Sequence, residues 1–133
     1  MDLERLSWEA AGIRWGCPVI YASRVYEGAL LEQLVYAVRG RLPRSRVASR
    51  IVIPDDLSVP VLDVAQHPDW RDEVRSREIG KAWAASQGSV ALRVPSFVAH
   101  PWGWNVVINP NHPEFGRVVV AEVVDVLWDP RVI

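Results

Sequence analysis

Two stretches of the chain have the residue pattern of helices. The first follows the short apolar run 18–23 and extends to Gly40, with Ser23 as its expected N-cap. Residues 77–88 form the second predicted helix, which ends at its glycine. Glu32 falls about 100° from Leu31 on a helical wheel, at the edge of the first helix's apolar stripe. That stripe, which is expected to be buried, comprises Leu30, Leu31, Leu34, Val35 and Val38.

Apolar runs bounded by turn residues predict the strands. Pro54 halts the alternating run that begins at Val47, because its nitrogen has no hydrogen to donate to a neighbouring strand. Pro95 ends another run, and the run from Trp104 continues into a turn rich in Asn and Pro. Strands outnumber helices, so we predict an α+β fold with a mixed, mostly antiparallel sheet flanked by helices. The runs with strand character are 18–23, 47–54, 89–96, 104–115 with its turn, and 117–124.

Length and composition indicate one globular domain. The chain has 133 residues, of which 50% are hydrophobic and 23% charged, enough to form a core without staples. Cys17 is the only cysteine, which excludes an internal disulfide and any CxxC zinc or redox motif, and favours the cytoplasm. No apolar run has the length of a membrane helix, and the first residues lack the pattern of a signal peptide. A soluble protein without membrane contact is expected.

The charge balance argues against nucleic-acid binding. The formal net charge is −1, whereas binding to phosphate backbones depends on an excess of Lys and Arg. One local cluster of arginines is either a solvated loop or a contact for an acidic partner or a phosphate. It consists of Arg39, Arg41, Arg44, Arg46 and Arg50.

Missing motifs exclude several reaction classes. The sequence contains no GxGxxG, GxxxxGK[ST], HExxH or GxSxG, so Rossmann-type hydride transfer and P-loop phosphoryl transfer have no support. His100 and His112 have no third ligand at a recognisable spacing, so no metal is expected. Nothing in the sequence brings Cys17 to a histidine as a nucleophile and its base.

Six short motifs resemble, in order, those of one bacterial toxin family. The residues alone would make Arg14 a surface arginine, Tyr21 a core aromatic, Glu32 a solvated helix residue and Ser96 a turn hydroxyl. The motifs "GIRWG", "VIYAS", "ALLEQL", "REIGKAWAASQGSVALRVPS", "WNVVINPNHPEF" and "LWDPR" together resemble the RES domain, which is named for its Arg, Glu and Ser. The resemblance spans residues 12–131, so the whole chain 1–133 is expected to be a single RES-like domain.

The resemblance implies a fold, a substrate and a partner. RES toxins attack NAD+, have a fold similar to ADP-ribosyltransferases, and are held by an antitoxin with a helix-turn-helix of the Xre type. Matched motif by motif, the family's arginine, tyrosine, glutamate and serine fall on Arg14, Tyr21, Glu32 and Ser96. The chain departs from the family in three ways. Gly16 replaces an asparagine, the interval from Arg14 to Tyr21 is short, and little of the family's N-terminal strand is expected.

Cleavage of NAD+ suits this set of residues. Nicotinamide leaves its ribose as a neutral base, so the reaction needs no acid, and one carboxylate can stabilise the positive charge that develops on the sugar. Glu32 would supply that carboxylate, with Glu27 as its rival on the same predicted helix. Arg14 would bind the pyrophosphate as a planar fork of donors. Tyr21 would face the nicotinamide and Ser96 the ribose or the carboxamide, while Asn105 and Asn109 would line the pocket or only form turns.

The resemblance leaves three alternatives. The acceptor of ADP-ribose is water, phosphate or a protein side chain, which corresponds to a glycohydrolase, a phosphorylase or an ADP-ribosyltransferase. A member of the family without activity would act by binding alone. A small α+β binding module unrelated to the family is the third alternative.

Overall fold

The computed structural model describes residues 1–7, 19–39 and 47–131. Within these ranges the chain forms six strands, two α-helices and one short 3-10 helix, which confirms the α+β prediction. The elements are β1 (Asp2–Ser7), β2 (Ile20–Ser23), α1 (Tyr26–Arg39), β3 (Val47–Val52), α2 (Glu73–Ser86), β4 (Ala91–Pro95), β5 (Trp104–Ile108), η1 (Phe115–Arg117) and β6 (Val119–Asp125).

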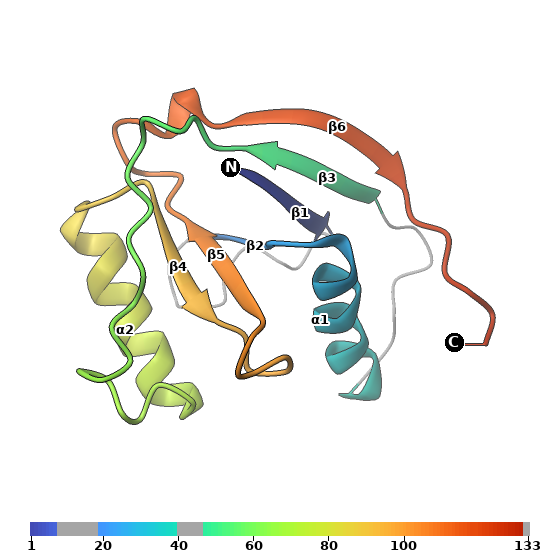
Figure 1. Cartoon of the computed structure of the whole chain (residues 1–133), viewed down its shortest axis with the longest axis horizontal. Helices are drawn as coiled ribbons and strands as arrows, with labels where there is room; N and C mark the ends of the chain where they lie inside the picture. The colour runs from blue at the N-terminus through green and yellow to red at the C-terminus, as the bar shows by residue number, and fades with distance from the viewer. Residues whose placement is uncertain (8–18, 40–46, 132–133) are drawn as a thin grey trace.

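The strands form a single sheet in the order β4-β5-β2-β1-β3-β6. Neighbouring strands are antiparallel at all five pairings. An isolated parallel bridge, between Val61 and Arg93, adds the segment before α2 to the edge of β4. In Figure 1, β3 and β6 run across the top of the molecule while β4 and β5 descend steeply, so the sheet is strongly twisted.

The N-terminal strand corrects an expectation from the sequence, which left little room for one. β1 lies in the middle of the sheet and pairs with β3 from Asp2↔Val52 to Ser7↔Val47. Its pairing with β2 is limited to Glu4↔Ser23. Leu3 accounts for the central position of this strand, because its side chain is 0% exposed within the main core.

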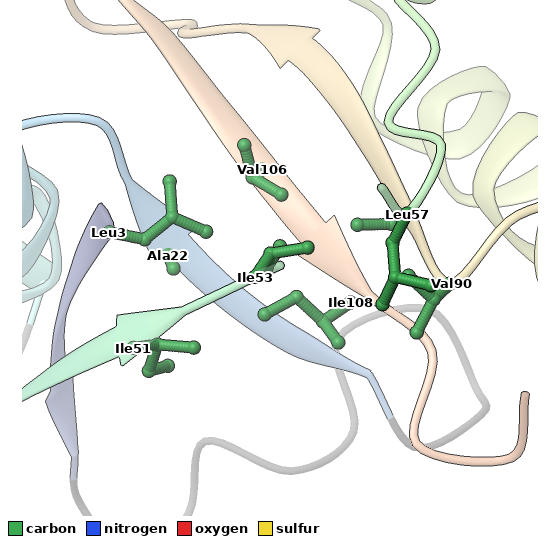
Figure 2. Close-up of a cluster of buried hydrophobic side chains, with 9 residues drawn as sticks. Leu3, Ala22, Ile51, Ile53, Leu57, Val90, Val106 and Ile108 are labelled. Carbon is green, nitrogen blue, oxygen red and sulfur yellow. The ribbon is translucent and has the colours of Figure 1, made fainter. Parts of the chain in front are cut away.

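The main core fills one face of the twisted sheet. Figure 2 shows Leu3, Ala22 and Ile51 near Val106 and Ile108, which come from four different strands. Residues from loops complete this cluster, among them Ile53, Leu57 and Val90. Because side chains alternate along a strand, the neighbours of these residues point to the opposite face.

Both helices cover that opposite face. Trp83 of α2 packs against a cluster that includes Leu92 and Val107, and Ala29 of α1 packs against Ala48 of β3. The sequence-based choice of the buried stripe on α1 was partly wrong, since Leu31 and Val35 are each 37% exposed. Small residues such as Ala29 make this contact in place of Leu31 and Val35, because small side chains allow the helix to lie close to the sheet.

The ends of both helices also differ from the prediction. Ser23 belongs to β2 and does not cap α1, which begins only at Tyr26. α2 begins one turn earlier than predicted, at Glu73, because Asp72 caps it by accepting a hydrogen bond from the Arg75 backbone N–H (2.9 Å). It ends at Gln87, whose φ of 53° is left-handed, one residue before the expected glycine.

Candidate functional site

A cavity of about 370 Å³ opens on the helix-covered face of the sheet. Figure 1 shows α1 and α2 on either side of β4 and β5, and residues of both helices line the cavity. Its volume is in the range of small-molecule sites. Tyr21, Leu92 and Val94 come from the sheet, Glu32 and Val35 from α1, and Glu73, Ser76, Arg77, Ile79 and Gly80 from α2.

Glu32 projects from α1 into a group of polar side chains at this cavity. Its Oε1 accepts hydrogen bonds from Asn105 Nδ2 (3.0 Å) and from Ser96 Oγ (3.2 Å). The two donors belong to β5 and to the residue directly after β4. Both of these hydrogen bonds go to Oε1, and Glu32 is one of the residues that line the cavity.

Asn105 connects Glu32 to strand β2. It is 2% exposed, and its Oδ1 accepts a hydrogen bond from Ser23 Oγ at 2.9 Å. Its Nδ2 also lies 3.4 Å from the Tyr21 hydroxyl oxygen, in addition to its bond to Glu32. The fold thus brings together four of the predicted site residues, from two strands, a helix and a loop: Tyr21, Glu32, Ser96 and Asn105.

Ser96 is positioned by the turn that follows β4. Its backbone N–H donates to the Gly103 carbonyl (3.0 Å), and its Oγ accepts from the Ala99 N–H (3.0 Å). With that acceptor position occupied, the hydroxyl hydrogen is directed to Glu32. Ser96 therefore orients the carboxylate of Glu32. This role is more specific than that of a turn hydroxyl, which spacing alone suggests.

Asn109 is not brought into this group. It follows the other end of β5, where its Nδ2 donates to the Ala84 carbonyl (3.0 Å) and its Oδ1 accepts from the Asn111 N–H (3.0 Å). These contacts give it a turn-forming role next to the end of α2. Glu27, the rival carboxylate, is exposed in the first turn of α1 and does not line the cavity. Arg14 lies outside the described residues.

The family model of the RES domain matches residues 7–129. The chain belongs to the RES domain family. This confirms the family expected from the six motifs and, with it, an enzyme of the NAD+-consuming toxin type.

Curated relatives agree with this assignment. The RES chain is 33% identical to the "Prs ADP-ribosylating toxin" of Sphingobium sp. (strain YBL2) over 141 aligned positions, which cover 99% of this chain and 87% of the relative. It is 33% identical to a "Toxin Res" of Pseudomonas putida, with 76% of this chain and 72% of the relative covered. A second "Toxin Res", from Yersinia enterocolitica, is 28% identical and covers 92% of this chain and 85% of the relative.

A solved structure shows the same fold. The match is to the crystal structure of the M. tuberculosis MbcT-MbcA toxin-antitoxin complex, with a TM-score of 0.71. It covers 94% of the RES chain and 83% of the other chain. Because the sequence identity is only 16%, this likeness supports the fold alone.

The sequence did not indicate that α2 would line one side of the cavity. Arg77 is the only cation that lines the cavity among the described residues. The neighbouring Arg75 is paired instead with Asp69 (3.3 Å) and Glu78 (3.1 Å). The predicted helix began at Arg77. It therefore lacked the first turn, which brings Glu73 and Ser76 to the cavity wall beside Arg77. Trp70 and Phe97 add an aromatic contact there, with ring centroids 5.4 Å apart.

Two ion pairs at the surface, away from the cavity, shift the pKa values of their side chains. A hydrogen bond from Arg117 lowers the pKa of Asp56, and the same bond raises the pKa of Arg117. Arg131 likewise lowers the pKa of Asp129 through a side-chain hydrogen bond. All these groups are at the surface, where ion pairs contribute little to stability, and none of them lines the cavity.

Residues 1–7, 19–39 and 47–131 contain no group of three or more His, Cys, Asp or Glu side chains arranged to hold a metal ion. His112 accepts a hydrogen bond from the Glu114 N–H through Nδ1 (3.0 Å), and His100 lies against Trp70. Neither helix in these ranges is long and apolar enough to cross a bilayer.

Proposed function

We propose that this RES-family enzyme is the toxin of a toxin–antitoxin pair and cleaves the bond between nicotinamide and ribose in NAD+. Glu32 is the residue that stabilises the reacting sugar. The observation that supports this role is the fixed orientation of its carboxylate at the cavity. Asn105 and Ser96 donate to Oε1, so the remaining oxygen can face a ligand.

The chemistry of the bond explains why one carboxylate suffices. As the bond lengthens, nicotinamide departs as a neutral base and positive charge develops on the ribose. A fixed anion next to the sugar stabilises this charge more in the transition state than in the ground state, which is what accelerates the reaction. Oriented hydrogen bonds reduce the reorganisation that the carboxylate must undergo during the step.

The other side chains bind different parts of the dinucleotide. Tyr21 lines the cavity beside Glu32 and offers a flat face to the nicotinamide. Arg14 remains our candidate for the pyrophosphate, and Arg77, which lines the cavity from α2, offers the same anion a second cation. In this proposal NAD+ is the substrate and no metal takes part.

The acceptor of the ADP-ribosyl group distinguishes two forms of this activity. Water or phosphate would make the chain a glycohydrolase or a phosphorylase. The relative from Sphingobium carries the name "Prs ADP-ribosylating toxin", which favours transfer to a protein side chain as the second candidate. Both forms share the first step, so the role of Glu32 is the same in each.

An antitoxin is the proposed partner. The solved structure with the same fold is a toxin-antitoxin complex, which supports a partner of this kind. By family resemblance we assign it a helix-turn-helix of the Xre type. NAD+ is a metabolite of the cell interior, so the proposed activity places the chain in the cytoplasm.

The decisive experiment incubates the purified protein with NAD+ and separates the products by mass. Release of nicotinamide is expected together with free ADP-ribose, its 1''-phosphate when phosphate is present, or a labelled protein when a cell extract is added. Folded protein that releases no nicotinamide under any of these conditions would contradict the proposed function and favour a family member that acts by binding.

A further inference from the structure

We infer that Ser23 is a positioning residue that orients Glu32 through the side-chain amide of Asn105. The effect of Ser23 on turnover rests on the proposed function, whereas its effect on Asn105 does not. Ser23 is 3% exposed, and its Oγ lies 2.9 Å from Asn105 Oδ1. The β2–β5 register places these two residues directly opposite each other.

The need for Ser23 follows from the chemistry of an amide. A carboxylate only accepts hydrogen bonds, so the NH₂ end of Asn105 has to face Glu32, as it does at 3.0 Å. The carbonyl end is then left buried and requires a donor of its own. The Ser23 hydroxyl supplies this donor, and without it the Asn105 carbonyl would be unsatisfied.

Gly28 provides independent support for this arrangement. A Cβ atom at this position would lie 3.3 Å from Ser23 Cβ and 3.4 Å from Ser23 Oγ, which is tighter than ordinary contacts. Glycine has a lower helix propensity than alanine, and the close approach to Ser23 gives a packing reason for its presence in the first turn of α1. Gly28 and Glu32 are four residues apart on one face of α1, so the first turn of this helix lies against the same serine that contacts Asn105.

Side-chain hydrogen exchange tests the connection without any assay of activity. The NH₂ protons of Asn105, observed by NMR in ¹⁵N-labelled protein, should exchange much more slowly than those of the exposed Asn111. Ser23→Ala should accelerate exchange at Asn105 at least about threefold, because one neutral hydrogen bond is lost. Equal exchange at Asn105 and Asn111 in the unmutated protein, or no change in Ser23→Ala, would overturn the inference.

A matched control separates this effect from general loosening. Ser89 is also buried, and its hydroxyl bonds to the Ala91 carbonyl (2.8 Å) and accepts from Trp83 Nε1 (3.0 Å), away from Glu32. Ser89→Ala makes the same chemical change in a different part of the fold. It should leave exchange at Asn105 unaltered. Acceleration of equal size in both variants would mean that Ser23 has only a structural role.

Kinetics then tests the consequence for Glu32. Ser23→Ala should lower kcat for nicotinamide release about 3- to 10-fold, with little change in KM, because it moves the carboxylate and leaves the binding walls intact. In an Asn105→Ala background the same substitution should have no further effect. Equal losses in both backgrounds would contradict the connection, whereas absence of turnover in the unmutated protein would contradict only the proposed function.

Discussion

At the scale of single residues, the carboxylate of Glu32 is the group on which the proposed chemistry depends. We expect Glu32→Gln to lower the rate of nicotinamide release about 100- to 1,000-fold, the range found when one electrostatic stabiliser is removed. Glutamine keeps an oxygen that can accept the bonds from Asn105 and Ser96, so the fold should be preserved and circular dichroism should be unchanged.

Glu27→Gln is the matched control for this prediction. It removes the same charge from the same helix at a residue that does not line the cavity. Its rate should stay close to that of the unmutated protein. If the two variants lost activity equally, the effect would come from helix charge and not from a carboxylate in the site.

A second residue-scale prediction concerns the wall opposite Glu32. Arg77→Gln should raise KM for NAD+ about 3- to 10-fold with kcat nearly unchanged, because an exposed guanidinium contributes modestly to binding an anion. Arg75→Gln removes a cation that is already paired with Asp69 and Glu78 and should leave KM unaltered. Steady-state kinetics of the two variants decides between a role in binding and a solvated position.

Part of the site could be predicted from sequence. Family motifs singled out Tyr21, Glu32 and Ser96, and the structure places all three within one hydrogen-bonded group. The sequence predicts Ser23 as a helix cap, because a hydroxyl at the end of a strand can cap a helix or bond across the sheet. Only the pairing of β2 with β5 distinguishes these roles, and that pairing joins residues 82 positions apart.

At the scale of elements, the side chain of Asp72 caps the N-terminus of α2. Asp72→Ala removes the acceptor for the Arg75 N–H and should lower the free energy of unfolding by about 1 kcal/mol. Asp72→Asn keeps a good cap and should be nearly neutral. Urea denaturation of both variants measures the difference, and equal losses would show that the negative charge matters more than the cap.

Strands were predicted well where proline or turn residues mark their ends. Pro95 and the turn rich in Asn and Pro bounded β4 and β5 correctly, since proline cannot donate to a neighbouring strand. β1 was missed because Leu3 and Leu6 are three residues apart, a spacing without strand alternation. Its conformation is imposed by pairing with β3, and tertiary context of this kind overrides local preference.

At the scale of the whole molecule, stability depends on the core that Figure 2 shows. Leu3→Ala should lower the free energy of unfolding by about 2–5 kcal/mol, because it leaves a cavity beside the central strands. Leu127 is 93% exposed, and Leu127→Ala should change stability by no more than about 0.5 kcal/mol. A small loss for Leu3→Ala in thermal or urea unfolding would mean that β1 contributes little to the fold.

The order in which the ribosome synthesises the chain affects when the polar group around Glu32 can form. Glu32 is synthesised 64 residues before Ser96 and 73 before Asn105, yet its orientation requires both. Contacts so distant along the chain form only after the intervening sequence has been made and folded. In a nascent chain, the proposed catalytic carboxylate therefore lacks both supports until the segment through Asn105 has been made and has folded.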